Sequence, residues 1–393
     1  MTDYIFSHHD CDGIISTHLI KTYLSPNAKV TFQKWYNFGI NYKDLPEQAD
    51  TIYVLDLGVK KTTLDSLAEW SLQHPSSKVI LLDHHEPQGI NPMDYASPNF
   101  QIVHDTEQCT SSITYLFVKA MNREIEPIDE QLTIIGIFGD VAYELKGTQP
   151  LLAELKEKYP ELFWNFAYWT GKYEAKLPIP SLYSRFLSVG KRLAFEKGAE
   201  LGLKAVEEIK RAGTLAILED FLEWLRNPKD PTILQSREQD LKYPYCTILK
   251  YWYHLWTEIR DEILSERYVK TLDFSNFQFC LINHPLSVAS WVAFVKSQHK
   301  PCIAVNYGIQ GDYAELSGRA KEEQGINLVN IATLVNEQLR TDMGGHECSI
   351  GGTIPKKIPT LQVIRAFEKA FTGQTGWTES FLKLISESEE KTL

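Results

Sequence analysis

The sequence lacks any uninterrupted apolar run long enough to cross a membrane, which predicts a chain with no membrane-spanning segment. Its start, Met1-Thr2-Asp3, has neither the basic nor the apolar stretch of a secretory signal, so we expect a cytoplasmic protein with no membrane partner. The six cysteines are scattered without a C-x-x-C pair, a pattern typical of reduced thiols and not of disulfides or a zinc site. Internal repeats and low-complexity tracts are also lacking.

Positive charge is scarce as well. The chain has 40 Lys and Arg against 51 Asp and Glu, for a net charge of −11. Residues 1–150 hold about 20 acidic residues and about 10 basic ones, and such a surplus attracts cations. Clear basic clusters are missing, although a firm grip on long nucleic acid needs many Lys or Arg contacts to phosphate. The charge therefore favours metal recruitment and short substrates over long, tightly held strands.

A chain of 393 residues is too long for one core and predicts two or three domains. Strand-like and helix-like segments alternate at the beginning, a helical pattern follows, and strand signals return from about residue 275. We expect an α/β protein with an N-terminal doubly wound, mostly parallel sheet, a helical connector and a smaller C-terminal mixed α/β domain. The expected divisions are 1–235 with its sheet core in 1–145, the connector 236–272, the second domain 273–375, and a tail 376–393.

The expected elements follow from the period of the apolar residues. Strands are predicted at 4–7, 51–55, 79–82, 277–282, 302–307 and 314–317. Helices are predicted at 14–20, 62–70 with a threonine cap, 110–118, 328–339 and 360–371. The Thr/Ser-rich opening of 110–118 presents N–H groups and hydroxyls either to an anion or as an ordinary helix cap. The aromatic run Phe163–Trp169 has helical spacing, which favours a place in the core over rings on which bases stack.

Acids and histidines follow four apolar segments at the point where each ends. The four groups are His8-His9-Asp10-Cys11-Asp12-Gly13, Asp56, Asp83-His84-His85 and Asp140. In an open parallel sheet, ligands bind outside the carboxyl ends of the strands, so these groups could meet in one crevice. Carboxylate and imidazole together suit Mn²⁺, and two such ions bridged by a shared carboxylate activate water for attack on phosphorus. The local alternatives are simpler, because Asp10 or Asp12 also suits a helix cap and Asp56 a turn.

Taken in order, these residues resemble the motifs of the DHH phosphoesterases. Near the other end, Gly344-Gly345-His346 resembles the glycine-rich GGH signature of the DHH-associated C-terminal domain, and Ser317-Gly318-Arg319 its arginine motif. Met343 stands where the family often has a third glycine, and Ser349-Ile350 where it has alanines, which weakens any inference about the nucleotide end recognised. The compact two-domain form looks most like the oligoribonuclease (nanoRNase) branch.

The resemblance implies a set of metal ligands for two divalent ions, Mn²⁺ first, with Mg²⁺ or Co²⁺ as alternatives. Asp10 would bind one ion, Asp12, His84 and Asp140 the other, and Asp56 would bridge them, with His8 as a further ligand. His9 is expected to point outward.

Two neighbours of the ligands have supporting roles. Asp83 is expected to orient the ligating His84 by accepting its ring N–H. His85 would contact the scissile phosphate, although alone it would suit a buried core histidine.

The second domain would bind the substrate. Arg319 can clasp a phosphate with two nitrogens. Gly344 and Gly345 would let the backbone approach the substrate, and His346 would meet its phosphate or ribose. Taken alone, these residues would suit a surface arginine and a glycine-rich turn. The active site is expected in the cleft between the two domains.

The predicted function is a two-metal phosphodiesterase that cleaves short oligoribonucleotides or small nucleotide phosphodiesters to mononucleotides, in which Asp83, His85 and Arg319 serve the reaction. A RecJ-like 5′–3′ exonuclease on single-stranded DNA is the alternative within the same class. A nucleotide- or RNA-binding sensor that has lost catalysis is the alternative of another class, and a homodimer stays open.

Overall fold

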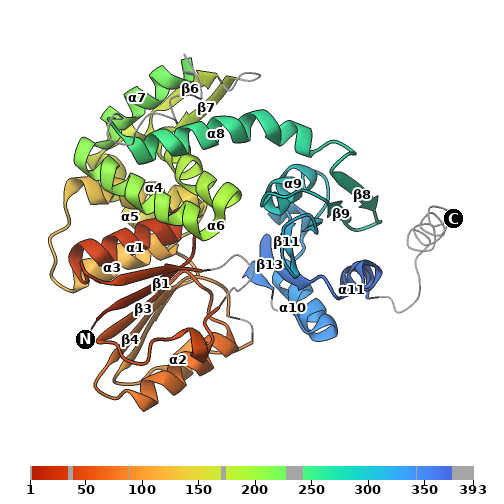
Figure 1. Cartoon of the computed structure of the whole chain (residues 1–393), viewed down its shortest axis with the longest axis horizontal. Helices are drawn as coiled ribbons and strands as arrows, with labels where there is room; N and C mark the ends of the chain where they lie inside the picture. The colour runs from red at the N-terminus through yellow and green to blue at the C-terminus, as the bar shows by residue number, and fades with distance from the viewer. Residues whose placement is uncertain are drawn as a thin grey trace. The chain divides into compact units, whose positions relative to one another are not determined.

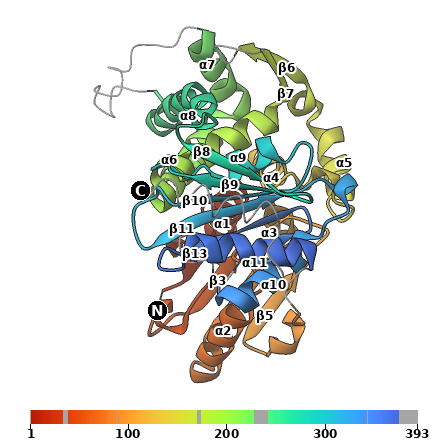
Figure 2. The ribbon, with the colours of Figure 1, turned by 90° about the vertical axis from the view of Figure 1, so that its right-hand side faces the viewer.

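The computed structural model describes residues 2–33, 39–87, 89–169, 174–226, 242–341 and 343–373, so the predicted tail 376–393 lies outside the described residues. The chain divides into two compact units, Met1–Arg260 and Asp261–Leu393 (Figure 1 and Figure 2). The finer division with a connector at 236–272 stays a prediction. Among the described residues, no helix has the length and apolar character that a membrane span requires.

Unit 1 is built on a five-stranded sheet in the order β2-β1-β3-β4-β5, with every neighbouring pair parallel. Its strands are β1 (Tyr4–Ser7), β2 (Lys29–Phe32), β3 (Thr51–Leu55), β4 (Lys78–Asp83) and β5 (Phe100–His104). Helices α1 (Cys11–Tyr23) and α3 (Thr110–Ala120) cover one face, and α2 (Lys61–Gln73) covers the other (Figure 1). The predicted doubly wound sheet is confirmed. Its strand order reverses between β1 and β3, where such folds place their ligands.

Alternate residues of the strands supply the two halves of the core. Ile52 and Val54 of β3 pack with Leu64 and Trp70 of α2, while Leu55 packs with the α1 and α3 side. Because both faces are covered, the three central strands β1, β3 and β4 are apolar in their interiors and carry their polar residues at the ends.

Further helices lie on the α1 and α3 side of unit 1. They are α4 (Pro127–Gly139), α5 (Gln149–Lys158), α6 (Ile179–Ala212), α7 (Thr214–Arg226) and α8 (Pro244–Ile263). A Cβ atom on Gly139 would lie 2.7 Å from the Cβ of Cys11, so α4 approaches the first turn of α1 closely and ends beside it. This packing brings Asp140, the residue that caps the C-terminus of α4, to the carboxyl ends of the strands.

Two local predictions for unit 1 are wrong. The aromatic run was expected to be helical, but β6 (Asn165–Trp169) pairs with β7 (Glu174–Pro178) in an antiparallel ribbon. Aromatic residues have high strand propensity, and here this outweighs their helical spacing. The side chains of β6 lie outside the described residues. Helix α2 begins after Lys60, whose side chain makes no capping bond, so the expected threonine cap is absent from it.

Unit 2 has a mixed sheet in the order β12-β13-β11-β10-β9-β8, in which β9 and β10 are parallel. Its strands are β8 (Val269–Asp273), β9 (Gln278–Ile282), β10 (Cys302–Asn306), β11 (Tyr313–Arg319), β12 (Gly344–His346) and β13 (Ser349–Pro355). The helices are α9 (Ala289–Lys296), α10 (Leu328–Leu339) and α11 (Thr360–Thr372). The predicted mixed α/β domain is confirmed, although β8, β12 and β13 were not predicted.

Candidate metal centre

The first polar group lies where β1 passes into α1. Asp10 is the N-cap of α1 and accepts a hydrogen bond of 3.2 Å from the backbone N–H of Gly13, while Asp12 lies in the first turn. The sequence left open which of the two carboxylates caps the helix, and the structure gives that role to Asp10. Gly13 packs against the carbonyl group of His8, where a Cβ atom would clash, so the tight turn needs glycine. The turn keeps His8, Asp10 and Asp12 close together.

Asp56 lies at the centre of the site. It follows β3 with a φ of +61°, a left-handed conformation that non-glycine residues seldom adopt and that is often found at functional sites. Its Oδ1 lies 3.2 Å from Nε2 of His84, and its Oδ2 lies 3.4 Å from Nδ1 of His8. The two oxygens of one buried carboxylate therefore face two different sets of neighbours.

These neighbours form two groups of potential ligands that share Asp56. We call Asp12, Asp56 and His84 the inner group, and His8, Asp10 and Asp56 the outer group. Within each group, the ligand atoms lie within 4.8 Å of one another. All three residues of the inner group are buried, whereas His8 and Asp10 are partly exposed.

His84 lies near the two carboxylates of the inner group and near a third one, that of Asp140. Its Nε2 lies 3.2 Å from Asp56, 3.5 Å from Asp140 and 4.0 Å from Asp12. Burial alone lowers the pKa of His84, but Asp140, Asp56 and Asp12 outweigh it and raise that pKa well above its ordinary value. For Asp12, burial and the charges of Asp56 and Asp140 raise the pKa. Three carboxylates are thus gathered around one point, where positive charge is strongly favoured.

The first turn of α3 holds the inner carboxylates. The backbone N–H groups of Thr110 and Ser111 donate to Asp12 at 2.9 and 2.8 Å, and the Thr110 hydroxyl donates to Oδ1 of Asp56 at 3.2 Å. The sequence left open whether this helix start meets an anion or is an ordinary cap. The N–H groups at this helix start bind a carboxyl group of the protein itself, that of Asp12.

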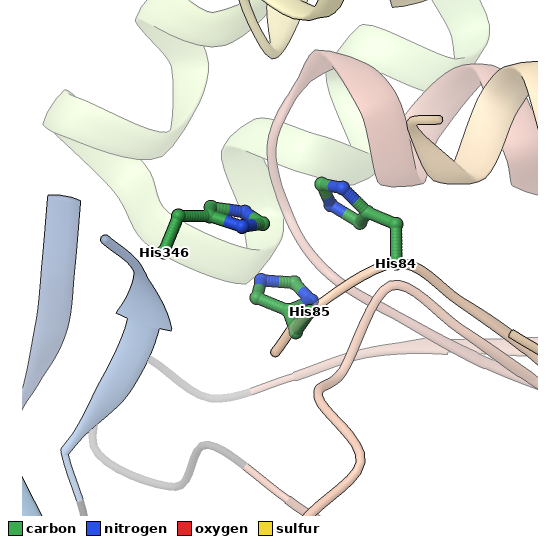
Figure 3. Close-up of side chains that lie close together, drawn as sticks. All are labelled: His84, His85 and His346. Carbon is green, nitrogen blue, oxygen red and sulfur yellow. The ribbon is translucent and has the colours of Figure 1, made fainter. Parts of the chain in front are cut away.

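Asp83 orients a histidine, but the ring that it is seen to hold is that of His85, whereas His84 was expected. The fully buried carboxylate accepts hydrogen bonds from Gly58 N–H at 2.7 Å, from His85 N–H at 2.8 Å and from the His85 Nδ1–H at 3.0 Å. Burial raises the pKa of Asp83, yet the neighbouring His85 and His84 lower it overall, so the carboxylate stays ionised. Figure 3 shows His84 and His85 next to each other after β4. Their ring centroids are 4.6 Å apart.

Three residues near the site were missed or misplaced by the sequence analysis. His9, expected to point outward, is buried with its ring edge-on to that of His8. Lys191 of α6 places its Nζ 3.4 Å from Oδ2 of Asp10, and His104 at the end of β5 bonds the carbonyl oxygen of His85 at 2.8 Å. The position of His104 at a strand end was a usable signal. Lys191 lies within α6, far along the chain from Asp10, so the residues around it carry no such signal.

In unit 2, the predicted substrate residues lie on neighbouring strands. Ser349 of β13 pairs with His346 of β12 on one side and with Arg319 of β11 on the other. The Arg319 guanidinium donates to the hydroxyl of Ser349 and, at 3.2 Å, to that of Ser290. Figure 3 draws His346 on β12.

The two glycines before His346 also lie in β12. Gly345 has a φ of +149°, and a Cβ atom there would meet the backbone of β13. Glycine at this position is therefore required by strand pairing. A substrate role of Gly344 and Gly345 stays a prediction.

The donor set fits divalent metal ions. Carboxylate oxygen with imidazole nitrogen suits Mn²⁺, Mg²⁺ to a lesser extent, and other first-row ions. Several buried carboxylates close to one another are costly without a cation, and the raised pKa values of Asp12 and His84 show that the site strongly favours added positive charge. The fold and site together define an α/β protein with a candidate metal centre at the switch point of a parallel sheet.

Comparison with known proteins finds a family match in the N-terminal part of the chain. Residues 3–137 match the model of the DHH family, N-terminal domain. The search of curated proteins found no match.

Solved structures resemble the chain over nearly its whole length. The DHH domain of a protein described as a member of a ribosomal-protein family has 13% identity and a TM-score of 0.61, covering 94% of this chain and 86% of that one. Exonuclease RecJ bound to manganese has 14% identity and a TM-score of 0.56, covering 96% and 91%. RecJ from Thermus thermophilus in complex with Mn²⁺ has 16% identity and a TM-score of 0.55, covering 94% and 52%. At these identities the likeness shows the fold.

Proposed function

We propose that the chain is a metal-dependent phosphodiesterase that hydrolyses short oligoribonucleotides or small nucleotide phosphodiesters to mononucleotides. The observation that carries the proposal is the position of Asp56, whose two oxygens face the inner and the outer group within a DHH-family domain. A shared carboxylate between two sets of ligands is the arrangement that two-metal hydrolysis of phosphate esters uses.

In this proposal, the inner group with Asp140 would hold one ion and the outer group would hold the other. Mn²⁺ is the first choice, because RecJ structures of the same fold contain it, and Mg²⁺ and Co²⁺ are alternatives. When bound, the ions would lower the pKa of a water molecule and neutralise charge on the phosphate.

The remaining groups of unit 1 would orient the phosphate. Asp83 fixes the ring of His85 through Nδ1, and His104 bonds the His85 carbonyl oxygen, so side chain and backbone of His85 are both held. We assign its other ring nitrogen, Nε2, to a phosphate oxygen. A fixed donor costs no reorganisation when charge develops on the transferring phosphoryl group.

Unit 2 would supply the nucleotide contacts. Ser290 and Ser349 hold the Arg319 guanidinium in a defined orientation, which suits bidentate binding of phosphate. His346, one strand away from Ser349, is assigned to the phosphate or ribose, with the backbone at Gly344 and Gly345 beside it.

A product-resolved assay with Mn²⁺ on labelled substrates tests the function. The panel runs from a dinucleotide RNA through a small nucleotide phosphodiester to long single-stranded DNA. We expect mononucleotides from the short substrates. Faster degradation of long DNA from its 5′ end would favour a RecJ-like exonuclease instead. Nucleotide binding without any product would indicate a sensor, and the proposal would then be wrong.

A further inference from the structure

We propose that Thr110 is the residue that positions Asp12 and Asp56 for metal binding. This inference rests on the proposed function, because it assumes that both carboxylates are ligands. Thr110 is fully buried and contacts both of them, one through its backbone and one through its side chain.

The contacts of Thr110 select particular oxygens. Its N–H donates to Oδ2 of Asp12, and its hydroxyl donates to Oδ1 of Asp56. These same two oxygens face Nε2 of His84, at 4.0 and 3.2 Å. A carboxylate oxygen accepts two hydrogen bonds or ligand contacts, so each oxygen keeps one lone pair directed by Thr110 and one for a cation.

The start of α3 suits this task because its own cap is missing. Cys109 is the N-cap residue, and its side chain makes no capping bond to the helix. The first N–H groups of a helix need acceptors, and the positive end of the helix dipole favours a negative one. Asp12 of α1 fills that need through Thr110 and Ser111. The carboxyl group of Asp12 is therefore held at a fixed place before any metal arrives.

The hydroxyl of Thr110 has a separate role. Asp56 and Asp12 are two carboxyl groups that lie close together in a buried site, so they repel each other when both are ionised. Without a donor on its Oδ1, the Asp56 carboxylate could rotate away from this repulsion. Threonine offers that donor from a side chain whose χ1 is restricted by its branched Cβ, so the hydroxyl stays directed at Asp56.

Titration of Mn²⁺ into metal-stripped protein by calorimetry tests the inference directly. Thr110→Val removes the hydroxyl and keeps both the shape and the backbone N–H. We expect about 10- to 100-fold weaker Mn²⁺ binding, the usual cost of losing a group that orients a ligand. Thr110→Ser restores the hydroxyl and should bind within about threefold of the wild type. Ser112→Ala is the matched control, because the Ser112 hydroxyl bonds Gln108 and the Cys109 carbonyl oxygen in the same helical turn.

Folding is checked by circular dichroism and thermal unfolding of each stripped variant. Should Thr110→Val fail to fold, Thr110→Ala removes the same hydroxyl with a smaller side chain and is measured in its place. Equal Mn²⁺ affinity of wild type and the hydroxyl-free variant would overturn the role of Thr110 and leave the proposed function intact. A wild-type protein that binds no Mn²⁺ would instead refute the proposed function itself.

Discussion

The inner and outer groups share Asp56 but are built in opposite ways. Asp12 of the inner group is buried and receives two backbone N–H donors from α3. Asp10 of the outer group is partly exposed, caps its own helix and has the ammonium group of Lys191 3.4 Å away. The inner group has a further carboxylate beside it, that of Asp140, whereas the outer group has the ammonium group of Lys191 beside it.

This difference shows how one site can combine rigidly held carboxylates with side chains that are open to solvent. The inner carboxylates lie in the first turn of α1 and in the turn after β3, and donors at the start of α3 direct them before a ligand arrives. Preorganised groups lose little freedom on binding and so bind tightly. The outer group reaches solvent and is balanced by a long, flexible lysine. Under the proposed function, the inner group would hold its ion more firmly and the outer group would exchange its ion more readily.

The largest expected effect comes from Asp56, which belongs to both groups. Asp56→Asn keeps the size of the side chain, and asparagine tolerates the left-handed backbone at this position. It removes the shared charge, so we expect loss of Mn²⁺ binding at both groups and a fall in kcat/KM of roughly 10³-fold or more. Asp65→Asn on the exposed surface of α2 is the control and should leave both quantities unchanged. Near-normal metal binding by Asp56→Asn would show that Asp56 is not a ligand shared by the inner and outer groups.

The next effect separates orientation from metal binding. Asp83 offers no ligand in either group but accepts three hydrogen bonds, two of them from His85. Asp83→Asn should lower kcat by about 10²-fold through a misoriented His85 and reduce stability by about 2–4 kcal/mol, since a buried charged partner is lost. Mn²⁺ affinity should stay within about threefold of the wild type. Asp94→Asn, at an exposed carboxylate, serves as the control.

Much of unit 1 was predictable because parallel strands give continuous apolar runs that end in polar residues. The ends of β1, β3 and β4 pointed to His8, Asp10, Asp12, Asp56 and His84, and the structure brings these residues together. Asp140 was also predicted as a site residue, and the apolar segment that precedes it is the helix α4. The pattern brought these residues out because each of them lies within a few residues of the end of a strand or helix.

What escaped the sequence depends on contacts between distant segments. Lys191 reaches Asp10 from the middle of α6, and Thr110 reaches Asp12 and Asp56 across the packed helices. The orientation of Asp83 toward His85 was also missed, because a residue beside two histidines can serve either neighbour. Strand β12 is short and lies at a sheet edge, and its two glycines have low strand propensity. Local pattern carries none of this information.

The next effect in size is the release of a proton from His8 when the outer group binds a metal ion. Burial lowers the pKa of His8, but Asp10 and Asp56 outweigh it and raise the pKa to about 10 in the metal-free protein. A metal that takes His8 as ligand must displace this proton, so its apparent affinity should rise by up to about tenfold per pH unit between roughly pH 7 and 10. Because the folded-state pKa is raised, His8 also stabilises the metal-free fold fully below pH 6.5 and loses that contribution as pH rises through 10.

Calorimetry in buffers of different ionisation enthalpy counts the protons released at pH 8. His8→Asn should release one proton fewer than the wild type and bind metal with a shallower pH dependence. The inner group, in which the pKa of His84 is also raised by its carboxylates, should still release its own proton in that variant. Equal proton counts for wild type and His8→Asn would mean that His8 is not a ligand.

The smallest effect concerns Lys191, and its sign is informative. Burial raises the pKa of Asp10, but His8 and Lys191 outweigh it and lower that pKa, so the ammonium group already neutralises part of the outer group. Lys191→Met keeps the length of the side chain and removes the charge. Mn²⁺ should then bind the outer group about two- to fivefold more tightly, a modest gain because the ion pair is partly exposed and screened. Lys191→Arg keeps the charge and should match the wild type.

A second readout of the same variants separates the metal from the substrate. If Lys191 also meets an anionic substrate, KM will rise in Lys191→Met while metal affinity increases, and opposite changes of these two constants would assign the lysine to the substrate. Tighter binding at the inner group instead would contradict the division into two groups, because the Lys191 ammonium group lies beside Asp10 of the outer group.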